Sequence, residues 1–366
     1  MKATVLAALL LAYCILAACT RSSPNAQLVQ ADSLMQKFPD SALHFLEKIR
    51  PEELNSLEDR AYYALLVTQV QDKNYIFQEN DSLIRIAVQY YDSIKSTSMQ
   101  AKAHYYWGCI WRNREIYPQA LSRFFTAISY AQKVSDHKLT GYIYNNIANL
   151  YFLQKLYEQA DSIYQLTETI AVQEKDLWAD ALSQQGMIAI DRGKEYYHEA
   201  EQKILHAFKI SRHIAQKKMV AKTAYSLSLL YGRMNMGEKA VEFAKLNLND
   251  QETSNTLDRA YLVLGDAYYK TALYDSASIY LNKSLCSEDE YTKAGAYMRL
   301  ADIAMIQGNA ALSMQLERYS STYKDSLYQF RRNIVTDKIV EAETDAQLML
   351  HQLYYKGRLN IYLCIF

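Results

Sequence analysis

The sequence predicts an all-α protein, a solenoid built from about eight stacked helical hairpins. A small residue recurs at a spacing of 40 residues that shortens to 37 and 36: Ala120, Ala160, Ala200, Ala240, Ala277 and Ser313. In five of these six units a second small residue lies 12 positions earlier: Gly108, Ala148, Ser228, Gly265 and Ala301. In the third unit Gly186 precedes Ala200 by 14 positions, which indicates a two-residue insertion. A fixed period of this size is typical of proteins that stack one supersecondary unit many times.

Each unit contains two amphipathic helical stretches, as residues 101–130 illustrate. Trp107 and Trp111 lie at helical spacing on one face of a first helix, beside the small residue between them. Pro118 suits the first turn of a second helix, where its missing N–H removes no hydrogen bond. Ala120 shares a face of that helix with the residues four and seven positions later. Small residues where two helices cross allow a close approach, and aromatic side chains fill the space beside them.

The same pattern returns along the chain, for example as Tyr144, Ile147, Ala148, Tyr151, Tyr157, Ala160 and Tyr164. It resembles the tetratricopeptide repeat, whose pattern has an aromatic residue, Leu-Gly, Tyr, then Ala, an aromatic residue and Ala. The resemblance covers residues 99–318 and implies a right-handed α-solenoid. The period of 36–41 residues exceeds the usual ~34. The extra residues are expected between units, at Ala131–Leu139 and Ala171–Asp180, a lengthened form similar to that of Rap-type peptide-sensing regulators and LGN-type scaffolds.

Residues 31–98 are predicted to form divergent N-terminal helical hairpins that cap the stack. Helices are expected to open at Pro39 and at Asp81, 42 positions further on, close to the main period. Each opening is followed by apolar residues at helical spacing. The repeat pattern therefore extends to the N-terminal side in a degenerate form.

Residues 319–356 are predicted to form one long polar helix after the last repeat. Its apolar stripe consists of Tyr323, Leu327, Phe330 and Ile334. Packing on the last repeat is favoured over a coiled-coil stalk, because the heptad fails at Asp337. The apolar tail, residues 357–366, is too short to span a bilayer and fits either the end of this helix or the start of a spanning helix.

Residues 1–18 have the composition of a secretion signal, with Lys2 followed by a short apolar run. The run ends in Leu16-Ala17-Ala18-Cys19, which resembles the bacterial lipobox. The resemblance implies that Cys19 is acylated, with palmitate or similar chains, as in a tetratricopeptide repeat lipoprotein of the Bacteroidota type. Residues 19–30 would be a polar tether, and the repeats would lie in the cell envelope, with the outer membrane favoured. The alternative is an ordinary cleaved signal.

Composition argues against catalysis and nucleic-acid binding. The chain carries 40 basic and 40 acidic residues, so no basic surface is expected. We find no glycine-rich phosphate loop, no nucleophile elbow and no metal-ligand spacing among the 7 histidines, and therefore expect no enzyme, no cofactor and no metal. Cys109 and Cys286 are expected to be buried free thiols, because the cysteines are few and widely separated.

Proteins of the tetratricopeptide type bind partners on a concave face lined by the first helix of each pair. The positions that correspond to this face give a candidate partner-binding set: Tyr105, Arg112, Asn145, Asn149, Tyr225, Arg259, Asp266 and Tyr269. The asparagines and Arg112 suit a peptide backbone or a carboxylate. The carboxylate clamp of chaperone-binding members is missing, since Asp180 stands where a lysine is needed. The 32 tyrosines against 10 phenylalanines also suit a recognition surface.

Three functions were compared on these grounds. The first is a non-catalytic, membrane-anchored scaffold that binds a protein or peptide in its groove. The second is the periplasmic sensor part of a transmembrane signalling regulator, either complete or truncated. The third is a glycan-binding lipoprotein of the SusD type, which the regular repeat over most of the chain disfavours. Seven Asp-Ser-aliphatic sequences, among them Asp40-Ser41-Ala42 and Asp275-Ser276-Ala277, resemble a bacterial O-glycosylation sequon, with helix capping as the alternative.

Overall fold

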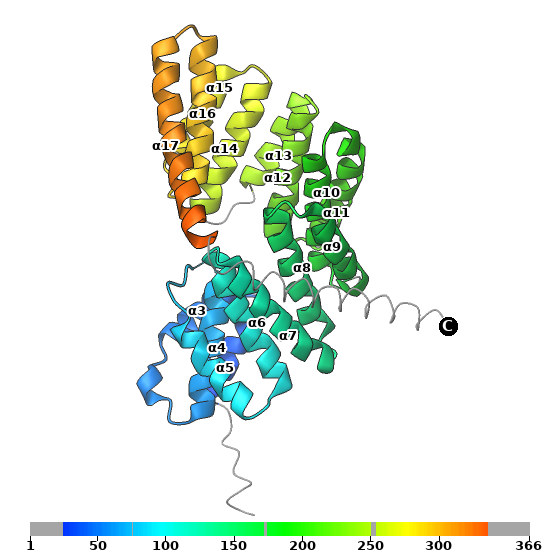
Figure 1. The fold of residues 1–366 in the computed structure, drawn as a ribbon, viewed down its shortest axis with the longest axis vertical. Helices are drawn as coiled ribbons and strands as arrows, with labels where there is room; N and C mark the ends of the chain where they lie inside the picture. The colour runs from blue at the N-terminus through cyan, green and yellow to red at the C-terminus, as the bar shows by residue number, and fades with distance from the viewer. Residues whose placement is uncertain (1–24, 75, 172–173, 250–253, 336–366) are drawn as a thin grey trace, which may run out of the picture. The chain divides into compact units, whose positions relative to one another are not determined.

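A computed structural model describes residues 25–74, 76–171, 174–249 and 254–335 (Figure 1). These residues form sixteen α-helices and two short 3₁₀-helices, and no strand occurs among them. The helices follow one another in eight consecutive pairs, which confirms the predicted all-α solenoid of about eight hairpins. Within the described ranges, no helix has the length and apolar character needed to cross a membrane. Cys19 and the tail after residue 335 lie outside these ranges.

The chain divides into two compact units, and the first runs to Arg114. Its elements are α2 (Ala26–Leu34), α3 (Pro39–Glu47), η1 (Pro51–Glu53), α4 (Leu57–Lys73), α5 (Ser82–Ser93) and α6 (Thr97–Asn113). Buried Leu28, Met35, Leu46 and Leu66 pack together between α2, α3 and α4. The helix openings expected at Pro39 and Asp81 are confirmed, because α3 begins at Pro39 and α5 directly follows Asp81.

The second unit begins at Glu115 and contains the regular repeats. Its first elements are α7 (Tyr117–Lys133), α8 (His137–Leu153), α9 (Tyr157–Ala171), α10 (Lys175–Arg192), η2 (Lys194–Tyr196) and α11 (Tyr197–His213). It continues with α12 (Lys217–Arg233), α13 (Gly237–Asn249), α14 (Ser254–Lys270), α15 (Tyr274–Ser284), α16 (Glu290–Ile306) and α17 (Ala310–Val335). One of its core clusters is formed by buried side chains of α10 to α14.

The division between the units falls inside the first regular repeat rather than at the expected boundary after residue 98. Several polar contacts tie α6 to the helices before it. The Trp107 indole donates to Asp81 at 2.8 Å, and the Arg112 guanidinium pairs with Asp72 at 2.8 Å. The imidazole of His104 lies 3.5 Å from the carboxylate of Asp92. These contacts explain why α6 clusters with α4 and α5.

Two helix boundaries also differ from the expected segments. The helix α2 begins at Ala26, inside the predicted tether, because the Asn25 side chain caps it by accepting from the N–H of Gln27 at 2.9 Å. At the other end, α17 runs without interruption across residue 318. It packs on α16 as far as Tyr323, whose ring stacks on that of Tyr297 with a centroid separation of 5.9 Å.

The extra length of the repeat lies in the helices, so the expected long connections are wrong. The helices α6, α7 and α8 each have 17 residues. They begin at residues 97, 117 and 137, so that one helix and one turn together take 20 residues. Only residues 134–136 separate α7 from α8, and α10 already begins at Lys175. The segment after Ala131 contains no proline or glycine, and buried Ala131 extends the apolar face of α7.

Within the second unit, from α8 onward, the recurring small residues lie where the two helices of a hairpin cross. The alanines of the 40-residue period are 0 % exposed, and Ser313 is 1 % exposed. A Cβ atom on Gly186 would come within 2.2 Å of the Ile204 side chain of the partner helix. The Ser228 hydroxyl donates to the carbonyl of Ala240 at 2.9 Å. The insertion in the third unit is confirmed as a longer turn, made by Gly193 and η2.

The turns after many helices use a residue with a left-handed backbone. The residues other than glycine with this conformation are Lys95, Glu115, Ser135, Lys155, Ala215, Asn235 and Ala272. In most of these turns the next N–H returns to a carbonyl in the last turn of the helix, as the N–H of Gln216 does to Ser211 at 3.3 Å. This is the Schellman arrangement that ends helices. A side chain in this conformation costs about 1–2 kcal/mol relative to glycine.

Replacing a residue at such a turn with glycine should therefore stabilise the protein. We expect Ala215→Gly (φ 52°) to raise the free energy of unfolding by about 1 kcal/mol in urea denaturation. The matched control is Lys209→Gly, at an exposed position inside α11, which should lower the free energy of unfolding by about 1 kcal/mol. Equal effects of the two substitutions would contradict the assignment of the turn.

Candidate functional site

The first helices of successive hairpins contact one another directly in the second unit. These first helices are α8, α10, α12, α14 and α16. The second helix of each hairpin makes its main contacts with first helices. Glycines allow part of this approach, since a Cβ atom on Gly141 would lie 2.5 Å from the Leu177 side chain and one on Gly295 would lie 3.1 Å from Leu262. We call the surface formed by these five helices the inner face of the second unit.

Six of the predicted partner-binding residues lie on first helices of this unit. Asn145 and Asn149 are on α8, and Tyr225 is on α12. The remaining ones are on α14: Arg259, Asp266 and Tyr269. Tyr105 and Arg112 belong to α6 in the first unit, and Cys19 lies outside the described residues. The structure thus groups the candidates by unit.

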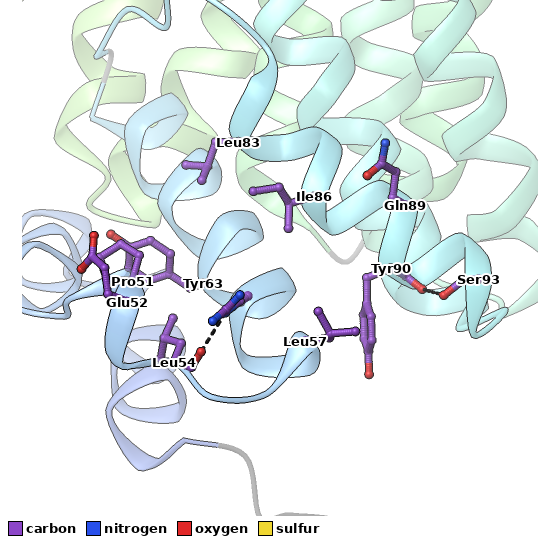
Figure 2. A pocket seen from close by; sticks show the side chains of 11 residues that line it. Pro51, Glu52, Leu54, Leu57, Tyr63, Leu83, Ile86, Gln89, Tyr90 and Ser93 are labelled. Atoms are coloured by element: carbon purple, nitrogen blue, oxygen red, sulfur yellow. Dashed lines mark hydrogen bonds between the residues drawn. The ribbon is translucent and has the colours of Figure 1, made fainter.

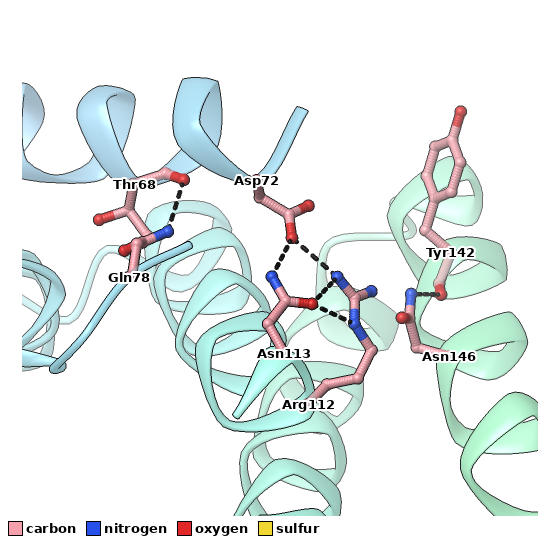
Figure 3. A network of polar contacts seen from close by, with 7 residues as sticks. All are labelled: Thr68, Asp72, Gln78, Arg112, Asn113, Tyr142 and Asn146. Carbon is pink, nitrogen blue, oxygen red and sulfur yellow. Dashed lines mark hydrogen bonds and ion pairs between the residues drawn. The ribbon is translucent and has the colours of Figure 1, made fainter. Parts of the chain in front are cut away.

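One candidate of the first unit, Arg112, belongs to a polar cluster that joins α4 and α6 (Figure 3). The Arg112 guanidinium pairs with Asp72 at 2.8 Å and donates to the Asn113 side-chain carbonyl at 2.8 and 3.0 Å. Tyr105 is buried, and this burial raises the pKa of its hydroxyl well above the usual value. Arg112 therefore has a structural role in holding the two helices together.

A carboxylate on α10 joins three helices of the inner face. The Asn145 side-chain amide donates to Asp180 at 2.6 Å, and Lys222 pairs with the other oxygen of the same carboxylate. The Tyr142 hydroxyl donates to Asp176 at 2.9 Å. The side-chain oxygen of Asn145 is buried and has no hydrogen-bond partner among the described residues. Asp180 thus satisfies donors that would otherwise bind a carboxylate, which agrees with the missing clamp.

A second polar group links α14 to α16. Arg299 pairs with Asp266 and, at 3.0 Å, with Asp302 on its own helix. Its guanidinium lies over the Tyr269 ring, 5.0 Å from the centroid, which is a cation–π contact. Arg259 pairs with Asp289 at 3.1 Å. The candidates on α14 are therefore held in one orientation by partners from the next repeat.

Two candidates on the inner face are not held by polar partners from a neighbouring repeat. Asn149 and Tyr225 make no side-chain hydrogen bond among the described residues, and both are half-buried. Burial raises the pKa of the Tyr225 hydroxyl, and nearby Tyr291 and Asp266 add to the shift. Asn149 can donate and accept hydrogen bonds at once, and tyrosine combines contact area with a polar tip. These two side chains are available to a ligand.

The sequence did not lead us to the residues that pair with the candidates and their neighbours on the inner face, namely Asp176, Lys222, Asp289 and Arg299. Asn145 and Asp180 are separated by 35 positions, and Asp266 and Arg299 by 33. Complementary side chains slightly less than one repeat apart were thus a signal in the sequence. The signal is visible only when neighbouring repeats are compared, because each pair joins two repeats.

The expectation for the cysteines is half correct. Cys109 is buried, whereas Cys286 is exposed, because it follows the end of α15 at a turn instead of facing a helix. Burial and the neighbouring Asp72 carboxylate raise the pKa of the Cys109 thiol to about 12. Among the described residues, no three His, Cys, Asp or Glu side chains lie close enough to hold a metal ion.

Comparison with known proteins supports the fold through similar solved structures. No protein-family model matches the chain, and no curated protein does. The crystal structure of apo RapI is 17% identical over 83% of this chain and 98% of that one, with a TM-score of 0.55. A Rap protein complexed with Competence and Sporulation Factor is 13% identical, covers 92% and 96% of the two chains, and has a TM-score of 0.58.

NprR in complex with its cognate peptide NprX is 14% identical over 89% of this chain and 98% of that one, with a TM-score of 0.51. These solved structures are helical-repeat proteins, and the likeness shows that this chain has the same tetratricopeptide-like solenoid fold. At such low identity, only the fold is shared on this evidence.

The two thiols should differ sharply in reactivity. In a variant that keeps only Cys109 and Cys286, a thiol reagent at pH 8 should label Cys286 within minutes and leave Cys109 unlabelled. A thiol pKa of about 12 leaves roughly one thiolate in 10⁴ at that pH. Mass spectrometry of the native and the urea-unfolded protein measures the labelling, and Cys109 should react only in the latter. Rapid native labelling of Cys109 would contradict its burial.

Proposed function

We propose that the chain is a non-catalytic scaffold that binds a protein or peptide segment along the inner face of the second unit. The observation that carries the proposal is the contrast on this face between paired and available side chains. Asp180 and Arg299 hold their neighbours in fixed orientations, so the face is organised before a ligand arrives. Asn149 and Tyr225 lie on the same face with unused hydrogen-bonding groups.

Segment binding suits this chemistry better than catalysis does. An extended peptide offers alternating N–H and C=O groups, and a side-chain amide can pair with one of each. A face that is ordered in advance loses little conformational entropy on binding. Two of the similar structures are complexes, of Rap with Competence and Sporulation Factor and of NprR with its cognate peptide. They support a peptide or protein ligand here.

We also propose that the scaffold is anchored to a bacterial membrane through lipid on Cys19, with the repeats in the cell envelope. The support is the tetrapeptide Leu16-Ala17-Ala18-Cys19 after a short apolar run. Stable anchoring needs more than one acyl chain, and a lipoprotein carries several. Anchoring would hold the inner face in the compartment where its ligand occurs.

Crosslinking from the inner face tests the binding proposal. A photoreactive amino acid at Asn149 in the native organism should trap a discrete partner, identified by mass spectrometry. The matched control is the same probe at exposed Thr169 on α9, a second helix. This probe should not trap the partner that the probe at Asn149 traps. The double change Asn149→Ala and Tyr225→Phe should weaken binding of the purified partner about tenfold, since two hydrogen bonds are lost. Identical products from both probe positions would count against the inner face.

The change Cys19→Ala tests the anchor. It should move folded protein from the membrane fraction to the soluble envelope fraction, because no acyl chain can then be attached. Cys14→Ala is the matched control, since it removes a cysteine of the signal segment and should leave the fractionation unchanged. Intact mass of the native protein reports acylation directly. A Cys19→Ala protein that stays in the membrane fraction after dilution would show that another element anchors it.

A further inference from the structure

An apolar cleft opens on the first unit between η1, the start of α4 and α5 (Figure 2). Its volume is about 760 Å³. Leu54 and Leu57 line it from the α4 side, and Leu83, Ile86 and Tyr90 line it from α5. Leu57 is 71 % exposed and Ile86 is 46 % exposed, so the cleft presents apolar surface to its surroundings.

The cleft lies along an uncovered face of α5. This helix has two apolar stripes, and the buried one contains Ile84, Ala87, Val88 and Tyr91. Leu83, Ile86 and Tyr90 form the second stripe, which lines the cleft. The preceding second helix, α3, has only 9 residues and makes its main contacts with α2 and α4. It therefore does not cover the second stripe of α5.

The first residue that the structure describes is held at the start of α4. The backbone N–H of Asn25 donates to the Asp59 carboxylate at 3.1 Å. Asp59 lies in the first turn of α4, the turn that also carries Leu57 and Arg60. Asn25 lies six positions after Cys19, a span of at most about 20 Å. A bilayer that holds the lipid on Cys19 therefore comes within reach of the cleft.

We propose that the cleft is a membrane-contact site, in which Leu57 and Ile86 enter the interfacial region of the bilayer. This rests on the anchoring proposed above for Cys19. Tyr63 and Tyr90 also line the cleft, and the amphipathic tyrosine ring suits the boundary between headgroups and acyl chains. Contact with lipid would cover the stripe of α5 that α3 leaves open.

Burial of apolar area, not charge, drives this contact. Glu52 and Arg60 are the ionisable acid and base that line the cleft, so their charges balance. The Arg60 guanidinium also donates to the carbonyl of Leu54 at 2.8 Å. Such a small surface binds lipid weakly by itself, but the tether raises the local lipid concentration and makes the contact effective. Binding should therefore respond little to salt or to the fraction of anionic lipid.

The test uses the full chain with Cys19→Ala, so that no acyl chain contributes. Its partition onto vesicles of phosphatidylethanolamine with 0 or 30 mol% phosphatidylglycerol is measured by sedimentation at about 0.1 and 0.5 M salt. Leu57→Glu with Ile86→Glu should lower the partition coefficient about tenfold. The matched control is Leu273→Glu with Ile279→Glu, which changes two similarly exposed side chains of the second unit and should have no effect.

A second measurement reports the contact without adding charge. Leu57→Trp should show a blue-shifted emission and quenching by brominated lipids when vesicles are added, whereas Ile279→Trp should show neither. Equal partition of the two double-glutamate variants, or none for the parent protein, overturns the site. The site is also overturned if the parent protein is a dimer that does not bind vesicles and the Leu57→Glu, Ile86→Glu variant is a monomer. That result would assign the cleft to contact with a second copy of the chain. The intact mass of native protein tests the lipid on Cys19 independently of these results.

Discussion

The structure depends on the close crossing of the two helices in each hairpin. Gly186 leaves room only for the Ile204 side chain opposite it, and Gly265 does the same for Leu281. Ser228 uses its hydroxyl to bond the partner backbone, so the crossing is fixed by a hydrogen bond as well as by shape. Interiors are packed to near-crystalline density, and a larger side chain at such a point would push the helices apart. The positions of all first helices in the second unit follow from these crossings.

The uniform length of helix and turn then places side chains of different repeats opposite one another. Turns such as that at Ala215 end many of the helices with a left-handed residue, and successive helices begin 20 residues apart over much of the chain. This regularity allows Asn145 to meet Asp180, and Asp266 to meet Arg299, across neighbouring first helices. Because each pair is formed between repeats, the pairs stabilise the stacking and orient the inner face in the same step.

The fold was largely predictable from the sequence because its signals are local and repeated. The small residues at Ala120 and its equivalents recur often enough to reveal hairpins without any single strong motif. Helix ends were less predictable: Ala131–Leu139 was expected to be a connection, but nothing in it stops a helix, and the turn at Ser135 has no glycine to mark it. At the site, the helices that carry the candidates were predictable, whereas the pairing of Asn145 was not, since it depends on how neighbouring repeats stack.

Function in such a protein should be sought where the repeat leaves groups unused. A paired side chain such as Arg299 would have to break two ion pairs before it could bind a ligand, and half-buried pairs are costly to break. Asn149 and Tyr225 have no such bond within the protein to lose, so a hydrogen bond to a peptide would replace only their contacts with water. The same argument applies to apolar surface: Leu57 and Ile86 are 71 % and 46 % exposed, so no packing within the protein has to be broken before they contact another molecule. The repeat provides the scaffold, and these local departures from it provide the surfaces that are open to other molecules.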